Sequence, residues 1–220
     1  ASESAGPGVL VTGVEHWTAK TTSDGDIRLF PWEKYVGSPA GKPAVLFVHG
    51  SSMASQPTFD LTVPGRPDSS VMDWFARRGF VCWCVDMEGY GRSAKSRDIF
   101  YDIANGADDL AAATDYIART RGVRAFMAYG ISSGALRAAL FAQRHPERIS
   151  RLALDAFVWT GEGAPTLVQR RKKLPEFLAS KRRPIDRAFV YSIFERDHPD
   201  CAEKRVVDAF ADAILALDDS

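Results

Sequence analysis

The stretch GISSG at residues 130–134 decides the fold, because of what stands on either side of it. The run 124–129 before it predicts a buried strand, and the run 133–144 after it predicts a helix. A G-x-S-x-G pattern in that setting is typical of a sharp, strained turn that projects the serine hydroxyl, and its glycines let other backbone pass closely. Ser132 is therefore the candidate nucleophile.

Two backbone amides are predicted to face this serine. The first belongs to Ser133, at the N-terminus of the predicted helix, where N–H groups stabilise a developing oxyanion. The second belongs to Ser51, in the loop HGSS at 49–52 that follows the continuously apolar run 44–48. Ligands of open α/β sheets bind outside the carboxyl ends of the strands, so both loops should open on one crevice. We expect the His49 imidazole to hold its loop by hydrogen bonds, with a role as catalytic base as the alternative.

Strands and helices alternate around these loops. The alternation, with short connections, implies an α/β fold with a mostly parallel sheet and right-handed crossovers. An Asp-Gly step at 24–25 is a strong hairpin signal, so an antiparallel pair opens the fold. The further strands are expected at 14–22, 27–36, 80–85 and 151–157, and the further helices at 69–78 and 104–120.

From residue 160 the pattern changes to three helical stretches with no strand between them, at 166–180, 184–195 and 202–217. Charge is uneven here, with basic residues concentrated over 170–187 and acidic residues over 195–219. We expect these charges to be the solvated faces of helices; the alternative is a surface that attracts an anionic substrate or a partner.

Composition limits the function classes. The 220 residues are 45% hydrophobic and 25% charged, which is globular usage. Lys+Arg and Asp+Glu are both 28, so no net field favours nucleic acid, and no apolar run approaches the roughly 20 residues that a membrane span needs. We expect free core thiols at Cys82 and Cys84 and a third free thiol at Cys201, which favours the cytoplasm. No metal or cofactor is expected, because no cysteine/histidine cluster has ligand spacing.

The order of three loops resembles a known superfamily. An H-G-x-x loop at 49–52, a D-x-x-G-x-G-x-S loop at 86–93 and the G-x-S-x-G turn at 130–134 follow successive strands. This order is similar to the α/β-hydrolase superfamily, and more closely to its lidded branch of serine esterases and related hydrolases. The resemblance covers roughly 14–160 by motif. It implies Ser132 as nucleophile, the Ser51 and Ser133 N–H groups as oxyanion hole, residues 1–159 as the N-terminal part of the core, and 160–220 as a helical lid.

The chain departs from the superfamily pattern at the catalytic base. The family's histidine follows the last strand of the sheet, and none of the histidines at 16, 49, 145 and 198 matches that position. We therefore expect a chain that lacks the last strands and helices, with the base on a C-terminal segment or second chain that completes the fold; a homo-oligomer is left open. Asp155 ends the strand before the lid, where some lidded members carry their acid, so it is either the triad acid or a structural or pocket-lining residue.

Aromatic residues at the start of the lid suggest the substrate. Phe157 and Trp159 are the candidate pocket residues, and they favour a small to medium apolar carboxylic ester. Amide, lactone or C–C bond hydrolysis by the same machinery is the alternative, because fold cannot choose among them. A ligand-binding protein without turnover and a partner-binding module built from the charged helices are the rival classes.

Overall fold

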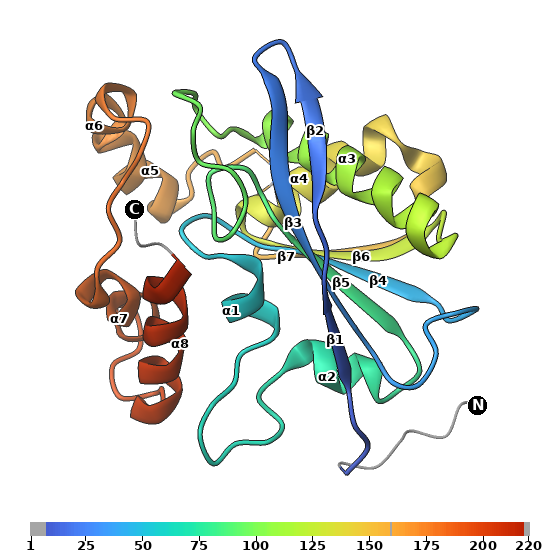
Figure 1. Ribbon diagram of the computed structural model, residues 1–220. Coiled ribbons are helices and arrows are strands. Elements are labelled where there is room, and N and C mark those ends of the chain that lie inside the picture. The colour runs from blue at the N-terminus through green and yellow to red at the C-terminus, as the bar shows by residue number, and fades with distance from the viewer. Residues whose placement is uncertain (1–7, 159, 218–220) are drawn as a thin grey trace.

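The structure of the protein is a computed structural model that describes residues 8–158 and 160–217 (Figure 1). Its centre is a twisted sheet with the strand order β1-β3-β5-β4-β6-β7, and β2 pairs with β3 beside this path. The strands are β1 (Thr12–Glu15), β2 (Thr18–Thr22), β3 (Gly25–Tyr35), β4 (Ala44–Val48), β5 (Val81–Asp86), β6 (Phe126–Ile131) and β7 (Ile149–Asp155).

The N-terminal hairpin forms as the Asp-Gly step predicts. Thr22 pairs with Gly25 at its tip, and Gly25 has a φ of +102°, which favours glycine. The strand expected at 14–22 is divided, because β1 pairs with the far end of β3 and β2 with its near end. His16 lies at this division and is buried, and its backbone N–H donates to the Pro31 carbonyl over 3.0 Å.

The parallel part of the sheet consists of β5, β4, β6 and β7. Every residue of β4 and β5 is buried, as their continuous apolar runs predict. Alternate residues of these strands serve two cores. On one face Leu46 and Trp83 pack with α3 (Ile103–Arg121) and α4 (Ser133–Arg144), and on the other Phe47 packs with α1 (Ser55–Phe59) and α2 (Val71–Ala76). β7 is the edge strand and is largely exposed.

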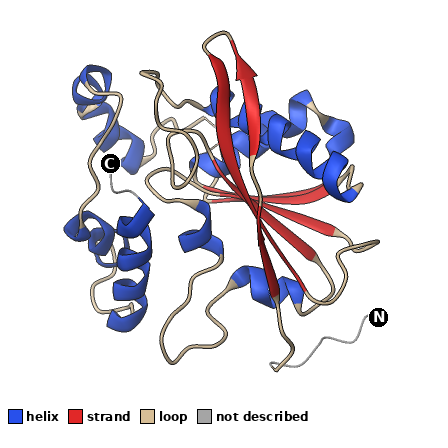
Figure 2. Cartoon of the chain, in the orientation of Figure 1, coloured by secondary structure: helices blue, strands red, loops and turns tan. Residues whose placement is uncertain are grey.

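The helices of the segment predicted to be a lid lie beside the carboxyl ends of the strands (Figure 2). They are α5 (Pro165–Lys172), α6 (Leu174–Ala179), α7 (Arg187–Glu195) and α8 (Lys204–Leu217). α8 buries Val207, Phe210 and Ile214, and it packs against α7 and α1. By contrast, α5 and α6 bury none of their residues.

Several predicted boundaries are wrong. The single helix expected at 166–180 is two helices, because Pro175 lies in the first turn of α6 and cannot continue the helix before it. β6 begins at Phe126 where 124 was expected, and β7 spans 149–155 where 151–157 was expected, because strand ends are set by pairing between neighbours. The short α1 and the 3₁₀ turn Pro146–Arg148 have no counterpart in the sequence predictions.

The expectation of free cysteines is confirmed within the described residues. Cys82 and Cys84 are buried free thiols, and Cys201 is an exposed one. No helix there is long and apolar enough to cross a membrane.

Candidate active site

The turn between β6 and α4 presents Ser132, as the G-x-S-x-G pattern predicts. Ser132 has a φ of +57°, a conformation that a non-glycine residue rarely adopts and that costs about 1–3 kcal/mol. A Cβ on Gly130 would collide with the Gly134 carbonyl, and a Cβ on Gly134 would collide with the Val48 carbonyl. The glycines are therefore needed where the turn folds back on itself and where it passes β4.

The loop after β4 lies against this turn. A Cβ on Gly50 would lie 3.2 Å from the Ser132 Cβ, and the hydroxyls of Ser51 and Ser133 are joined by a hydrogen bond of 2.7 Å. The structure thus brings together the candidate nucleophile and both candidate oxyanion residues from two strand ends. Their assignment as an oxyanion hole stays a prediction.

His49 holds the loop, as expected. Its Nδ1 lies 2.7 Å from the Gly50 carbonyl, and its Nε2 accepts the Met87 N–H over 3.0 Å. Burial lowers the pKa of His49 to about 3, and the nearby charge of Arg137 adds to this effect. The His49 imidazole is therefore neutral, and both of its nitrogens contact the backbone. It holds this loop and the backbone at Met87 in position.

Asp86 fixes the third loop in the same way. Its carboxylate accepts the N–H and the hydroxyl of Ser55, over 2.8 and 2.6 Å, and the N–H of Arg92 over 2.9 Å. Ser93 donates its hydroxyl to the Asp86 carbonyl. The carboxylate and carbonyl of Asp86 therefore hold the backbone of the D-x-x-G-x-G-x-S loop in place.

Within the described residues, no imidazole is hydrogen-bonded to the Ser132 hydroxyl. His16 contacts Tyr116 and Glu33 over 2.9 and 2.8 Å, and His145 lies 3.7 Å from Glu147 at the end of α4. His198 is exposed between α7 and α8. In the described part of the chain, Ser132 therefore lies beside the backbone of the loop after β4, with no histidine hydrogen-bonded to its hydroxyl.

Asp155 lies beside the turn at the end of β7. Its backbone carbonyl accepts the Ser132 N–H over 2.9 Å, and its carboxylate accepts a short hydrogen bond from the Tyr129 hydroxyl. Burial raises the pKa of Tyr129 to about 12, and the Asp155 carboxylate raises it as well. The role of Asp155 as acid stays a prediction. Phe157 is half-buried two residues further on, and Trp159 lies outside the described residues.

Sequence reasoning missed two side chains at this end of the sheet. Tyr129 is partly buried on the same face of β6 as Met127 and Ile131, and no sequence pattern indicates its contact with Asp155. Arg183, from the segment between α6 and α7, donates a short hydrogen bond to the Ser52 hydroxyl, and nothing local in the sequence indicates that contact.

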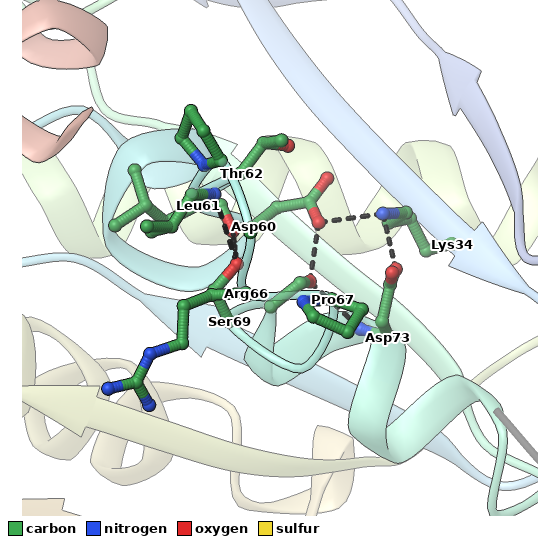
Figure 3. A pocket seen from close by; sticks show the side chains of 12 residues that line it. Lys34, Asp60, Leu61, Thr62, Arg66, Pro67, Ser69 and Asp73 are labelled. Atoms are coloured by element: carbon green, nitrogen blue, oxygen red, sulfur yellow. Dashed lines mark hydrogen bonds and ion pairs between the residues drawn. The ribbon is translucent and has the colours of Figure 1, made fainter. Parts of the chain in front are cut away.

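A cavity of about 470 Å³ lies elsewhere, under the loop between α1 and α2 (Figure 3). Lys34 lies between two acids there, 2.7 Å from Asp60 and in a short ion pair with Asp73. Burial alone would lower the pKa of Lys34, but the two carboxylates outweigh it and raise the pKa. None of the predicted site residues lines this cavity, and its charges neutralise one another.

Comparison with known proteins identifies the family of the chain. The family described as alpha/beta hydrolase fold matches residues 43–189. A Mycoplasma genitalium protein named "Putative proline iminopeptidase" is 28% identical over 130 residues, which cover 59% of this chain and 36% of that protein. The chain thus spans about a third of the length of this curated relative.

Solved structures agree on the fold. A thioesterase domain from the curacin biosynthetic pathway is 19% identical with a TM-score of 0.56, covering 90% of this chain and 67% of that one. Cfl2 from Burkholderia cenocepacia is 22% identical with a TM-score of 0.57, covering 91% of this chain and 65% of that one. At these identities the likeness is one of fold alone.

Proposed function

Because the chain belongs to the alpha/beta hydrolase fold family, we propose that it is a serine hydrolase that cleaves small to medium, apolar carboxylic esters. One observation carries the proposal. Ser132 stands at a φ of +57° between a strand and a helix, with the Ser51 and Ser133 hydroxyls joined beside it. A strained serine at a helix N-terminus, facing a second loop, is the arrangement that acyl transfer requires.

The proposed reaction runs through an acyl-enzyme. The Ser132 Oγ forms a bond to the ester carbonyl carbon while its proton passes to a general base. The Ser51 and Ser133 N–H groups stabilise the oxyanion, and collapse of the intermediate breaks the bond to the alcohol, which takes that proton. Water, deprotonated by the same base, then releases the carboxylic acid and restores Ser132.

We place the base on a segment outside these 220 residues, in the same protein or a second chain. Each histidine within reach of the core is held by other groups: His16 by Glu33 and Tyr116, His49 by Gly50 and Met87. The exposure of β7 supports the proposal, because parallel strands are ordinarily covered on both faces. A further strand paired with β7 would bring its own carboxyl end to the Ser132 edge of the sheet.

A covalent serine probe tests the proposal. We expect a fluorophosphonate to label the intact protein once, at Ser132, as located by peptide mass spectrometry. Ser132→Ala should abolish the labelling, whereas Ser150→Ala, a serine on β7 whose hydroxyl donates to the Phe126 carbonyl, should leave it intact. Absence of label in a protein that still binds a neutral ester would favour a ligand-binding protein without turnover.

Amide hydrolysis is the second candidate, because the curated relative carries a peptidase name. The two are separated by one acyl group presented as a 4-nitrophenyl ester and as a 4-nitroanilide. We expect the ester to be cleaved much faster. Comparable kcat/KM values for the two would assign the protein to the amidases.

A further inference from the structure

Arg183 reaches from the lid to the loop that carries a candidate oxyanion donor. Its guanidinium donates to the Ser52 hydroxyl, and Ser52 follows Ser51, whose own hydroxyl is bonded to Ser133. Gly50, two residues before Ser52, lies against Ser132. Two residues of backbone span at most about 7 Å, so this guanidinium lies at the edge of the serine site.

The charge of Arg183 has no carboxylate partner within 4.0 Å in the part of the chain that the structure describes, and neither has Arg170 on α5. Other basic residues of the lid are paired: Lys181 lies 3.0 Å from Asp98, and Arg187 forms an ion pair with Asp212. Partial removal from water lowers the pKa of Arg183, and the charge of Arg170 lowers it further. Arg183 is therefore an exposed cation without a carboxylate partner among the described residues.

The guanidinium is also held in a fixed orientation. The Phe189 ring lies below it, with 4.5 Å between the guanidinium carbon and the ring centroid, and Ser52 takes one of its N–H groups. Arginine carries five N–H donors in a planar fork that matches a carboxylate. An arginine that is oriented by a ring and a hydroxyl, and that has no carboxylate partner among the described residues, is suited to bind an anion.

We propose that Arg183 binds a carboxylate of the substrate, so that the serine site prefers esters that carry a negatively charged group. This inference rests on the proposed function for the position of the ester. The inferred substrate therefore has an apolar part and one negatively charged group, which binds at the edge of the serine site.

Matched esters test the preference. Two carboxylate esters, the mono-4-nitrophenyl ester of adipic acid and the hexanoyl ester of 4-hydroxybenzoate, place the charge on the acyl or on the alcohol side. Each is compared with its primary amide, which has the same shape and no charge. We expect the carboxylate member of at least one pair to have a kcat/KM about tenfold higher, because a charged hydrogen bond to arginine is gained.

Arg183→Gln should remove this preference. Its amide can still donate to Ser52, but it has no charge, so the kcat/KM of the carboxylate ester divided by that of its amide partner should fall to about one. Arg171→Gln is the control, since Arg171 is an exposed basic residue on α5 and its removal changes the net charge equally. Equal loss for both members of each pair, or no preference in the unmodified protein, would overturn the proposal.

A binding measurement separates this inference from the proposed function. Calorimetric titration of the Ser132→Ala protein with monomethyl adipate and with methyl adipamate needs no turnover. We expect about tenfold tighter binding of the anion, lost when Arg183→Gln is added. If Ser132 is never labelled but the anion is still preferred, only the hydrolase proposal fails. If Ser132 is labelled and esters are cleaved without the preference, only the arginine site fails.

Discussion

Charged side chains are arranged in opposite ways in the sheet and in the segment predicted to be a lid. Under the hairpin, the Lys20 ammonium lies 3.0 Å from Glu88 and 2.7 Å from Asp109, and all three are buried. In the predicted lid, Arg183 donates to the Ser52 hydroxyl and has no carboxylate partner among the described residues. A buried charge is tolerated only where charged partners compensate the loss of water. The contrast therefore separates paired charges that stabilise the fold from an unpaired charge that is proposed to bind a ligand.

The largest effect is expected from Lys20→Met. It leaves the Glu88 and Asp109 carboxylates buried together, and burial already raises the pKa of Asp109 to about 6 with the lysine in place. Breaking a buried pair in this way costs about 3–5 kcal/mol. Urea unfolding measures it, and Lys204→Met is the control, because Lys204 is paired with Asp208 but is 81% exposed. A loss no larger than that of the control would contradict the assignment of Lys20 to the fold.

Acid should weaken the same cluster. Against the effect of burial, the hydrogen bonds from Arg97 and Lys20 lower the pKa of Glu88 to about 2, below the 4.5 of the unfolded chain. The stability that Glu88 contributes is therefore present above pH 4.5 and is lost as the pH falls toward 2.

We expect Glu88→Gln to remove on the order of 2 kcal/mol from this acid-dependent part of the unfolding free energy. Unfolding curves at pH 6, 4 and 3 give the slope. Glu147→Gln serves as the comparison, because Glu147 is 65% exposed. Parallel pH profiles for Glu88→Gln and the unmodified protein would show that the carboxylate is not stabilised by its partners.

Much of this architecture is predictable from local sequence. The helix after Ser132 was predicted with its observed ends, 133–144, because a Gly-containing turn starts it and His145-Pro146 stops it. The buried runs 44–48 and 80–85 identify β4 and β5 for the same local reason. The two-residue errors in β6 and β7 arise because the register with neighbouring strands, not the apolar run, sets where pairing begins.

The parts of the site that were missed depend on contacts between distant segments. Arg183 and Ser52 are separated by 131 positions, and Tyr129 and Asp155 by 26, so no periodicity or motif indicates that they meet. The uneven charge of 170–187 was visible in the sequence. Which of its cations are paired becomes clear only when Asp98 and Asp212 are placed beside Lys181 and Arg187.

A moderate effect is expected in the cavity under the α1–α2 loop. Asp60 accepts from Lys34 over 2.7 Å, from the Trp32 Nε1–H over 2.8 Å and from the Ser70 hydroxyl. Asp60→Asn keeps an oxygen for one donor but removes the charge, so we expect a loss of about 1–2 kcal/mol by urea unfolding. Asp68→Asn, on the same loop and exposed, is the control and should change little. If Asp60→Asn leaves the unfolding free energy unchanged, the charges of this cavity do not stabilise the fold. They would then belong, like Arg183, to the group of charges proposed to bind a ligand.

The smallest effect on folding is expected from Arg183→Gln, although it should change ligand preference most. The substitution keeps a donor for Ser52 and relieves the repulsion from Arg170, so its two consequences for stability oppose each other. We expect the unfolding free energy to change by less than about 0.5 kcal/mol. Arg187→Gln, which breaks the surface ion pair with Asp212, gives the scale for a lid arginine that has a partner. If the unfolding free energy falls by more than about 1 kcal/mol, Arg183 stabilises the fold as Lys20 does. The division between structural and ligand-binding charges would then be wrong for the residue on which the ligand proposal depends.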